Sequence, residues 1–163
     1  MKILAFDPGL ARTGFAIFAT RGNSYTLLDY GCLFTDKSLC IEDRISSLLE
    51  QTKKLVQLHK PEAMIIEKLF FNINKKTVIA VAQAQGALLA IAGQYKLKVH
   101  FLTPLQIKQT LTGYGRSDKK NVQKMVGLLL KMTKMPEPDD VVDAIACGLA
   151  YCSIKKFDSR IIV

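Results

Sequence analysis

The spacing of apolar residues along the chain predicts strands first and then an alternation of strands and helices. A short apolar run opens the sequence and stops at Asp7-Pro8-Gly9, which is typical of a buried strand that ends in a turn. Two further strand patterns follow with only short turns between them, so we expect an antiparallel meander. The three predicted strands cover residues 2–7, 13–19 and 24–34.

After the meander the apolar residues recur every third or fourth position, which predicts a helix that ends before Pro61. Strands and helices then alternate to the end of the chain. The predicted strands cover residues 63–67 and 99–102, and the predicted helices cover 77–97, 105–111, 120–130 and 139–154. This order predicts an α/β fold, with a five-stranded mixed sheet flanked by helices on both faces.

Length and composition are typical of one folded domain that spans residues 1–163. Hydrophobic residues make up 49% of the chain, too many for a disordered protein. No window approaches the ~18 unbroken apolar residues of a membrane span, and the run before Asp7 is too short for a signal peptide. We therefore expect a cytoplasmic protein without membrane association. The four cysteines form no Cys-x2-Cys pair, so we expect buried, reduced thiols rather than a zinc site or disulfides.

The net charge of +9 is concentrated in residues 104–135, which contain seven basic residues and a single acid, Asp118. A concentrated basic region is typical of proteins that bind nucleic acids or other polyanions. A solvated, lysine-rich surface would give the same count, so charge alone leaves both interpretations open. The basic residues of this segment are Lys108, Arg116, Lys119, Lys120, Lys124, Lys131 and Lys134.

Acidic residues end two of the predicted strands and interrupt an otherwise apolar helix. Asp7 ends the first strand, Glu67 ends the fourth, and Asp143 lies among apolar residues of the last helix. Acids on core elements are costly unless they are paired or bind a cation. Each has a simpler explanation, because Asp7 can fix a turn, Glu67 can mark the end of a strand, and Asp139 or Asp140 can cap the helix. Their coincidence favours convergence on one site.

Helical spacing places a second acid beside Asp143 without saying which one. Asp140 is three residues away and Asp139 is four, and both spacings share a helix face. Oxygen ligands without His or Cys suit hard cations such as Mg2+ or Mn2+. Two such ions, about 4 Å apart, stabilise the attacking and leaving oxygens in phosphoryl transfer. An acidic centre beside a basic segment therefore predicts a metal-dependent nuclease.

Five segments, in order across essentially the whole chain, resemble the RuvC family of bacterial Holliday-junction resolvases. They are Phe6-Asp7-Pro8-Gly9 with Thr13-Gly14, Ile66-Glu67-Lys68-Leu69-Phe70, Gln83-Ala84-Gln85-Gly86, Lys108-Gln109-Thr110 with Gly113, and Asp140-Val141-Val142-Asp143-Ala144-Ile145-Ala146. The resemblance implies a ribonuclease H-like fold and a homodimer that makes paired, symmetric, metal-dependent nicks in four-way DNA junctions, in recombination and repair. It also implies a branch-migration motor as a partner.

The resemblance assigns catalysis and metal binding to Asp7, Glu67, Asp140 and Asp143. It leaves Asp139 as a neighbour or cap, and it places Lys108 and Lys119 near the scissile phosphate. Phe70 matches an aromatic residue at the junction centre, where a ring can stack on unpaired bases.

Two more residues of the basic segment, Arg116 and Lys120, are candidate DNA contacts. Gln85 departs from the family, which usually has an arginine there, and this puts the contact of that cation in doubt. Alternatives remain: a ribonuclease H-like nuclease that acts on RNA or linear duplexes, and a junction-binding protein without catalysis. A nucleotide phosphotransferase of the actin/hexokinase type is disfavoured, because such proteins pair two domains of this kind. The small residues of the helix near 80–92 are a candidate dimer interface, and they could equally pack on the sheet of their own chain.

Overall fold

A five-stranded sheet forms the centre of the computed structural model, which describes residues 1–22, 24–69 and 75–161, with the backbone alone over 75–77 and 156–161. The strands, in the spatial order β3-β2-β1-β4-β5, are β1 (Lys2–Asp7), β2 (Arg12–Arg21), β3 (Ser24–Phe34), β4 (Ala63–Glu67) and β5 (Lys98–Leu102). β1, β2 and β3 pair antiparallel, whereas β4 runs parallel to both β1 and β5. The predicted meander and mixed sheet are confirmed.

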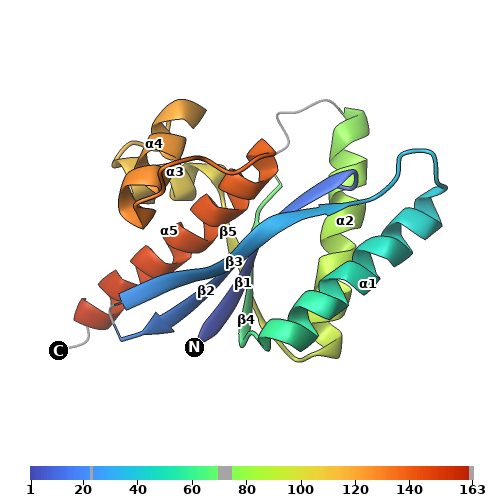
Figure 1. Ribbon diagram of the computed structural model, residues 1–163, viewed down its shortest axis with the longest axis horizontal. Helices are drawn as coiled ribbons and strands as arrows, with labels where there is room; N and C mark the ends of the chain where they lie inside the picture. Colours follow the sequence, from blue (N-terminus) through green and yellow to red (C-terminus); the bar gives the residue numbers. More distant parts are fainter. Residues whose placement is uncertain (23, 70–74, 162–163) are drawn as a thin grey trace.

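Helices cover both faces of this sheet, as predicted (Figure 1). They are α1 (Ile41–His59), α2 (Lys75–Gln94), α3 (Pro104–Thr112), α4 (Lys119–Leu130) and α5 (Asp139–Ile161). α1 and α2 lie on one face, α5 lies on the other, and α3 and α4 pack on α5. None of the helices within the described ranges is long and apolar enough to cross a membrane.

The alternation of side chains in β1 divides the buried residues between two cores. Ile3 and Ala5 pack toward α5, whereas Leu4 and Phe6 pack toward α1 and α2. Because successive strand residues point to opposite faces, the next residue, Asp7, lies on the α5 face. The end of this central strand therefore presents a carboxylate toward α5.

Gly148 lets α5 approach the sheet closely. A Cβ atom at this position would lie 2.6 Å from the ring of Phe18 and 3.0 Å from the Cβ of Ala5. Neither neighbour can move freely, since both are fully buried in the same core. The distance between α5 and the sheet therefore depends on a residue without a side chain.

Two helix ends differ from the predicted boundaries by three residues or more. α2 stops at Gln94 rather than 97, because Lys96 has a left-handed backbone (φ 54°) and the amide of Leu97 donates to the carbonyl of Ala92. α5 continues past 154 to Ile161. The end of α2 could not be predicted from residue type, because lysine rarely adopts the left-handed conformation that Lys96 has here.

The four cysteines are free thiols, but the expectation that all are buried was wrong. Cys147 and Cys152 are buried in α5, Cys32 is half-buried on β3, and Cys40 is exposed. Cys40 immediately precedes α1, where the chain runs over the surface.

Candidate active site

The carboxyl ends of two neighbouring parallel strands place Asp7 and Glu67 at the same edge of the sheet. Phe6 of β1 pairs with Ile66 of β4, and each acid is the next residue in its strand. Glu67 shares the α5 face with Asp7, because Ile65, two residues earlier, packs into the α5 core. Neither acid is fully exposed or fully buried. Local strand geometry therefore brings two carboxylates together without any long loop.

The first turn of α5 reaches the same edge through a contact with β2. Gly14 pairs with Asp7 across the β1–β2 ladder, and a Cβ atom on Gly14 would overlap the main-chain carbonyl of Asp140. Only a residue without a side chain allows this approach. Asp143, three residues further along α5, then faces the strand ends.

Three of the four predicted acids line one cavity of about 310 Å³ together with two of the predicted lysines. The lining residues are Asp7, Glu67, Pro104, Ile107, Lys108, Lys119, Val122, Asp143 and Ala146. Asp140 is not among them, although Asp143, one helical turn further along α5, is. The structure thus brings together residues from β1, β4, α3, α4 and α5 that lie far apart in the sequence.

Caps at two helix starts position the lysines of this cavity. α3 begins with a capping box, in which the Thr103 hydroxyl accepts from the Gln106 amide and the Gln106 side chain accepts from the Thr103 amide. α4 begins at Lys119, directly after Asp118, whose carboxylate accepts a hydrogen bond from the Asn121 amide at 2.8 Å. The basic segment is therefore held by short, well-defined helices.

Burial and mutual repulsion raise the pKa values of the cavity acids. The pKa of Asp7 rises to about 7, mainly through burial and then through the charges of Asp143 and Asp140. The pKa of Glu67 rises to about 8 through burial and the charges of Asp7 and Asp143, against the opposing effect of Lys108 and Lys119. Repulsion between these carboxylates disfavours their ionised forms, and a bound cation would stabilise those forms.

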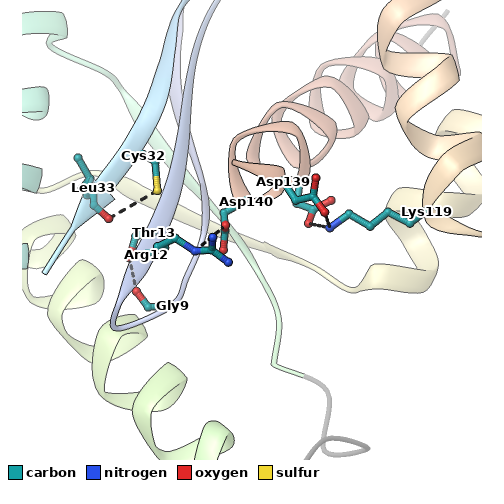
Figure 2. A network of polar contacts seen from close by, with 9 residues as sticks. Gly9, Arg12, Thr13, Cys32, Leu33, Lys119, Asp139 and Asp140 are labelled. Atoms are coloured by element: carbon teal, nitrogen blue, oxygen red, sulfur yellow. Dashed lines mark hydrogen bonds and ion pairs between the residues drawn. The ribbon is translucent and has the colours of Figure 1, made fainter. Parts of the chain in front are cut away.

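Two basic side chains, Arg12 and Lys119, form ion pairs with the acids at the start of α5 (Figure 2). Lys119 Nζ lies 2.8 Å from Asp143 Oδ2 and 3.2 Å from Asp139 Oδ2, so this lysine bridges both carboxylates. On the other side of the helix start, Arg12 Nε lies 3.1 Å from Asp140 Oδ2. Burial raises the pKa of Asp143, and the pairing with Lys119 opposes that rise.

The donor set of this site fits a hard divalent cation. All its charged acceptors are carboxylate oxygens, which such ions prefer. Asp140 Oδ2 is buried, and its contact with Arg12 lacks hydrogen-bond geometry, so no described residue hydrogen-bonds this oxygen. Within the described ranges, no three metal-binding side chains stand close enough to hold an ion as they are. Asp140 pairs with Arg12 and Asp143 pairs with Lys119 instead, and Asp143 already lines the cavity with Asp7 and Glu67.

The remaining candidate DNA contacts lie elsewhere or beyond the described residues. Lys120 lines a separate hollow on α4 with Lys124, Leu128 and Met132, so its side chain does not share the acid cavity. Arg116 is exposed in the loop between α3 and α4. Phe70, the candidate for insertion at the junction centre, lies outside the described residues.

Sequence reasoning missed Arg12 and the role of Asp139 as a partner of Lys119. A single arginine after a turn carries no periodic signal, and only the fold places it beside an acid 128 positions away. Asp139 was recognised only as a possible cap or an alternative to Asp140, since spacing alone cannot distinguish the two.

Comparison with known proteins identifies the family. The family model described as "Crossover junction endodeoxyribonuclease RuvC" matches residues 3–151. The protein of that name from Halothermothrix orenii is 43% identical over 151 residues, which is 93% of this chain and 92% of the relative. The corresponding protein from Alkaliphilus oremlandii is 38% identical over 157 residues, 96% of each chain.

Solved structures agree with this assignment. Thermus thermophilus RuvC superposes with a TM-score of 0.88 at 26% identity, over 97% of both chains. The same protein in complex with a Holliday junction substrate gives a TM-score of 0.89 at 26% identity, over 98% of this chain and 97% of that one. The expected ribonuclease H-like fold is confirmed, and the chain belongs to the RuvC family of crossover junction endodeoxyribonucleases.

Proposed function

We propose that this chain is a single-domain endonuclease that resolves four-way DNA junctions by paired, symmetric, metal-dependent nicks. One observation carries the proposal: carboxylates from β1, β4 and α5 line one cavity with Lys108 and Lys119. The chain belongs to the RuvC family, and a structural relative is in complex with a Holliday junction substrate. Both findings support junction DNA as the substrate.

Four acids form the proposed metal site. Asp7, Glu67, Asp140 and Asp143 would hold Mg2+, with Mn2+ as a substitute and two ions in each site. Bound ions of this kind supply a water of lowered pKa and neutralise charge on the phosphate. The protein contributes the positions of the carboxylates, and Asp7 and Glu67 must first lose the protons that their raised pKa values favour.

The lysines of the cavity would bind the DNA backbone. Lys119 pairs with Asp143 and Asp139, and a cation on Asp143 would free its ammonium group for a phosphate oxygen. Lys108 lines the same cavity and opposes the charge of Glu67. Phosphate contacts of this kind fix the position of the DNA and carry no sequence information.

A homodimer would supply the second nick. Two symmetric cuts need two sites, which a two-fold dimer places on matching strands. α2 exposes a stripe of small and apolar residues, which we call the α2 stripe: Ile79, Ala82, Gly86, Leu89, Ala90 and Gly93. Ile79 is 63% exposed, and a Cβ atom on Gly86 would meet no other atom within 4 Å. We propose this stripe as the interface. The branch-migration motor remains an expectation from the family alone.

A mobile synthetic junction with each strand labelled in turn tests the proposal. We expect nicks at the same position in two opposite strands in Mg2+ or Mn2+, and none in EDTA. Asp7→Asn should bind the junction without cutting it, because one metal ligand is lost and the DNA contacts stay. A linear duplex and an RNA–DNA hybrid of the same sequence serve as comparison substrates.

Two results would contradict the proposal. Faster cleavage of the duplex or the hybrid than of the junction would indicate a different ribonuclease H-like nuclease. Junction that is bound but stays intact in both metals would indicate a binding protein without catalysis.

A further inference from the structure

Arg12 is a cation beside the acid cluster that belongs to neither the cavity nor the basic segment. It opens β2, its side chain is 53% exposed, and its Nε faces Asp140 Oδ2 at 3.1 Å. Only Nε of the guanidinium lies at this carboxylate, so the four N–H donors of its two Nη nitrogens remain for other partners. Arg12 can therefore bind a second anionic group in addition to Asp140.

The pairing of Arg12 with Asp140 is easily exchanged. The contact lacks hydrogen-bond geometry at Oδ2, and the Arg12 side chain is half exposed, so water or another anion can replace Asp140 at the guanidinium. If Asp140 turns to bind a divalent cation, as the proposed function requires, Arg12 loses its partner. A free guanidinium at the edge of a nuclease site matches the geometry of a phosphate group.

Phe34 lies beside Arg12 on the same face of the sheet. The two residues are register partners of β2 and β3, and Phe34 is 58% exposed. Both side chains lie on the α5 face of the sheet. The pair two residues further along, Gly14 and Cys32, faces α5, and strand residues two positions apart share a face. An exposed aromatic ring next to a guanidinium is a common surface for a nucleic-acid strand, since the ring stacks on bases and the cation binds phosphate.

These residues lie on the opposite side of the acids from the lysines. The acids sit at the ends of β1 and β4, Arg12 and Phe34 follow on β2 and β3, and Lys108 and Lys119 come from the helices after β5. Figure 2 shows Arg12 and Lys119 on either side of the start of α5. Strands are about 4.8 Å apart, so Phe34 lies one strand spacing from Arg12, which itself contacts Asp140.

We propose that Arg12 and Phe34 form a second DNA-binding surface of the nuclease site, which we call the β2–β3 flank. Arg12 binds a backbone phosphate of the cleaved strand after it releases Asp140, and Phe34 stacks on an adjacent base. The strand is then held on both sides of the scissile phosphate, by the β2–β3 flank and by the lysines. The inference rests on the proposed function, because it needs DNA in the acid cavity.

Junction binding as a function of salt tests the proposal. The probe is a fluorescein-labelled synthetic four-way junction, and its anisotropy is measured with the full-length protein at several KCl concentrations, in Ca2+ and in EDTA. A denaturing gel verifies that the junction stays intact during each titration. The variants are Arg12→Gln, Arg12→Lys and Phe34→Ala. Matched controls are Arg21→Gln, at the far end of β2, and Leu58→Ala, an exposed apolar residue of α1.

Each variant has its own expected result. In Ca2+, Arg12→Gln should weaken binding about tenfold at low salt and reduce the slope of log K against log[KCl] by about one. The loss should be smaller in EDTA, where Arg12 stays with Asp140. Arg12→Lys keeps the charge and should retain the slope. Phe34→Ala should weaken binding at least about fivefold with an unchanged slope, and both controls should match the wild type.

A different pattern would overturn the inference. If Arg12→Gln keeps the wild-type affinity and slope in Ca2+ but melts at a lower temperature, Arg12 is only a counter-ion for Asp140. If Phe34→Ala binds like Leu58→Ala, the ring makes no DNA contact. Failure of the proposed function is distinguishable, because in that case the wild type itself would bind junction and duplex equally or leave the junction uncut in Mg2+.

Discussion

Gly14 lies directly against the main-chain carbonyl of Asp140, at the point where β2 meets the first turn of α5. Gly14 is also the ladder partner of Asp7. One residue without a side chain therefore sets the separation between the acid that ends β1 and the acids that begin α5. The shape of the site depends on this contact more than on any loop.

Replacing Gly14 with alanine should damage both the fold and the activity. The added methyl group must displace the start of α5, at an expected cost of about 1–3 kcal/mol in the free energy of unfolding. A displacement of about 1 Å at the acids should slow junction nicking by about a hundredfold. Urea unfolding and single-turnover nicking measure the two effects. A variant with wild-type stability and rate would contradict the close approach.

The two adjacent acids of α5 should differ strongly when they are neutralised. Asp140→Asn removes a proposed metal ligand and should reduce nicking at least about a hundredfold. Asp139→Asn removes only one of two partners of Lys119 and should cost less than about tenfold. Nicking rates on one junction, with circular dichroism as a control for folding, compare the pair. Equal losses would mean that Asp139 also binds the metal.

Glu67 should destabilise the metal-free protein at alkaline pH. Its pKa is about 8 in the folded state against an ordinary value of 4.5, so the folded protein binds more protons than the unfolded chain between these pH values. The free energy of unfolding therefore falls as the pH rises through this window. Glu67→Gln removes the effect, and should be about 1–3 kcal/mol more stable than wild type at pH 8.5 in EDTA. The difference should disappear at pH 4.5.

Urea unfolding at the two pH values measures this change. Glu50→Gln is the matched control, because Glu50 is an exposed acid of α1. A Glu67→Gln variant that is less stable than wild type at pH 8.5 would show that the carboxylate is favourably paired instead.

Metal affinity should rise with pH and release protons. Asp7 and Glu67, with pKa values of about 7 and 8, must both be ionised to bind a cation, so Mn2+ affinity should increase by up to about tenfold per pH unit for each proton released. Calorimetric titration in two buffers of different ionisation enthalpy counts the protons at pH 6.5. Asp7→Asn should release fewer protons than wild type. A pH-independent affinity would contradict the raised pKa values.

The proposed dimer can be tested at Gly86. A side chain there meets open space within one chain, so Gly86→Arg should leave the fold of the protomer intact. In a dimer through the α2 stripe the same side chain would collide with the partner or bury an unpaired charge. Sedimentation velocity should show a monomer for Gly86→Arg and a dimer for Leu58→Arg, which places the same charge on α1. A dimeric Gly86→Arg variant would exclude this interface.

The elements of the fold could be predicted from local patterns, but their spatial order could not. Apolar patterns located the five strands and five helices of the described residues, because helices bury one stripe and central strands such as β1 and β4 are apolar throughout. The order β3-β2-β1-β4-β5 depends on which strands pair over long distances, and a single sequence does not record this. The end of α2 was missed because Lys96 adopts a backbone conformation that its side chain does not favour.

The acids of the site could be predicted because charged groups on core elements are rare and need a reason. Asp7, Glu67 and Asp143 stood out in apolar surroundings, and the structure places them in one cavity. Charge density along the sequence was a poorer guide to the cations. It grouped Lys119 with Lys120, yet adjacent residues on a helix point in different directions, and only Lys119 faces the cavity.

α5 joins the proposed active site to the hydrophobic core. Asp140 and Asp143 lie in the first turns of the helix, and the same helix is held to the sheet at Gly148 by the buried Phe18 and Ala5. A helix transmits displacement along its length as a rigid body, so a change near Gly148 would be felt about 8–12 Å away at the acids. Substitutions in the core beneath α5, far from any DNA, should therefore change the rate of strand cleavage.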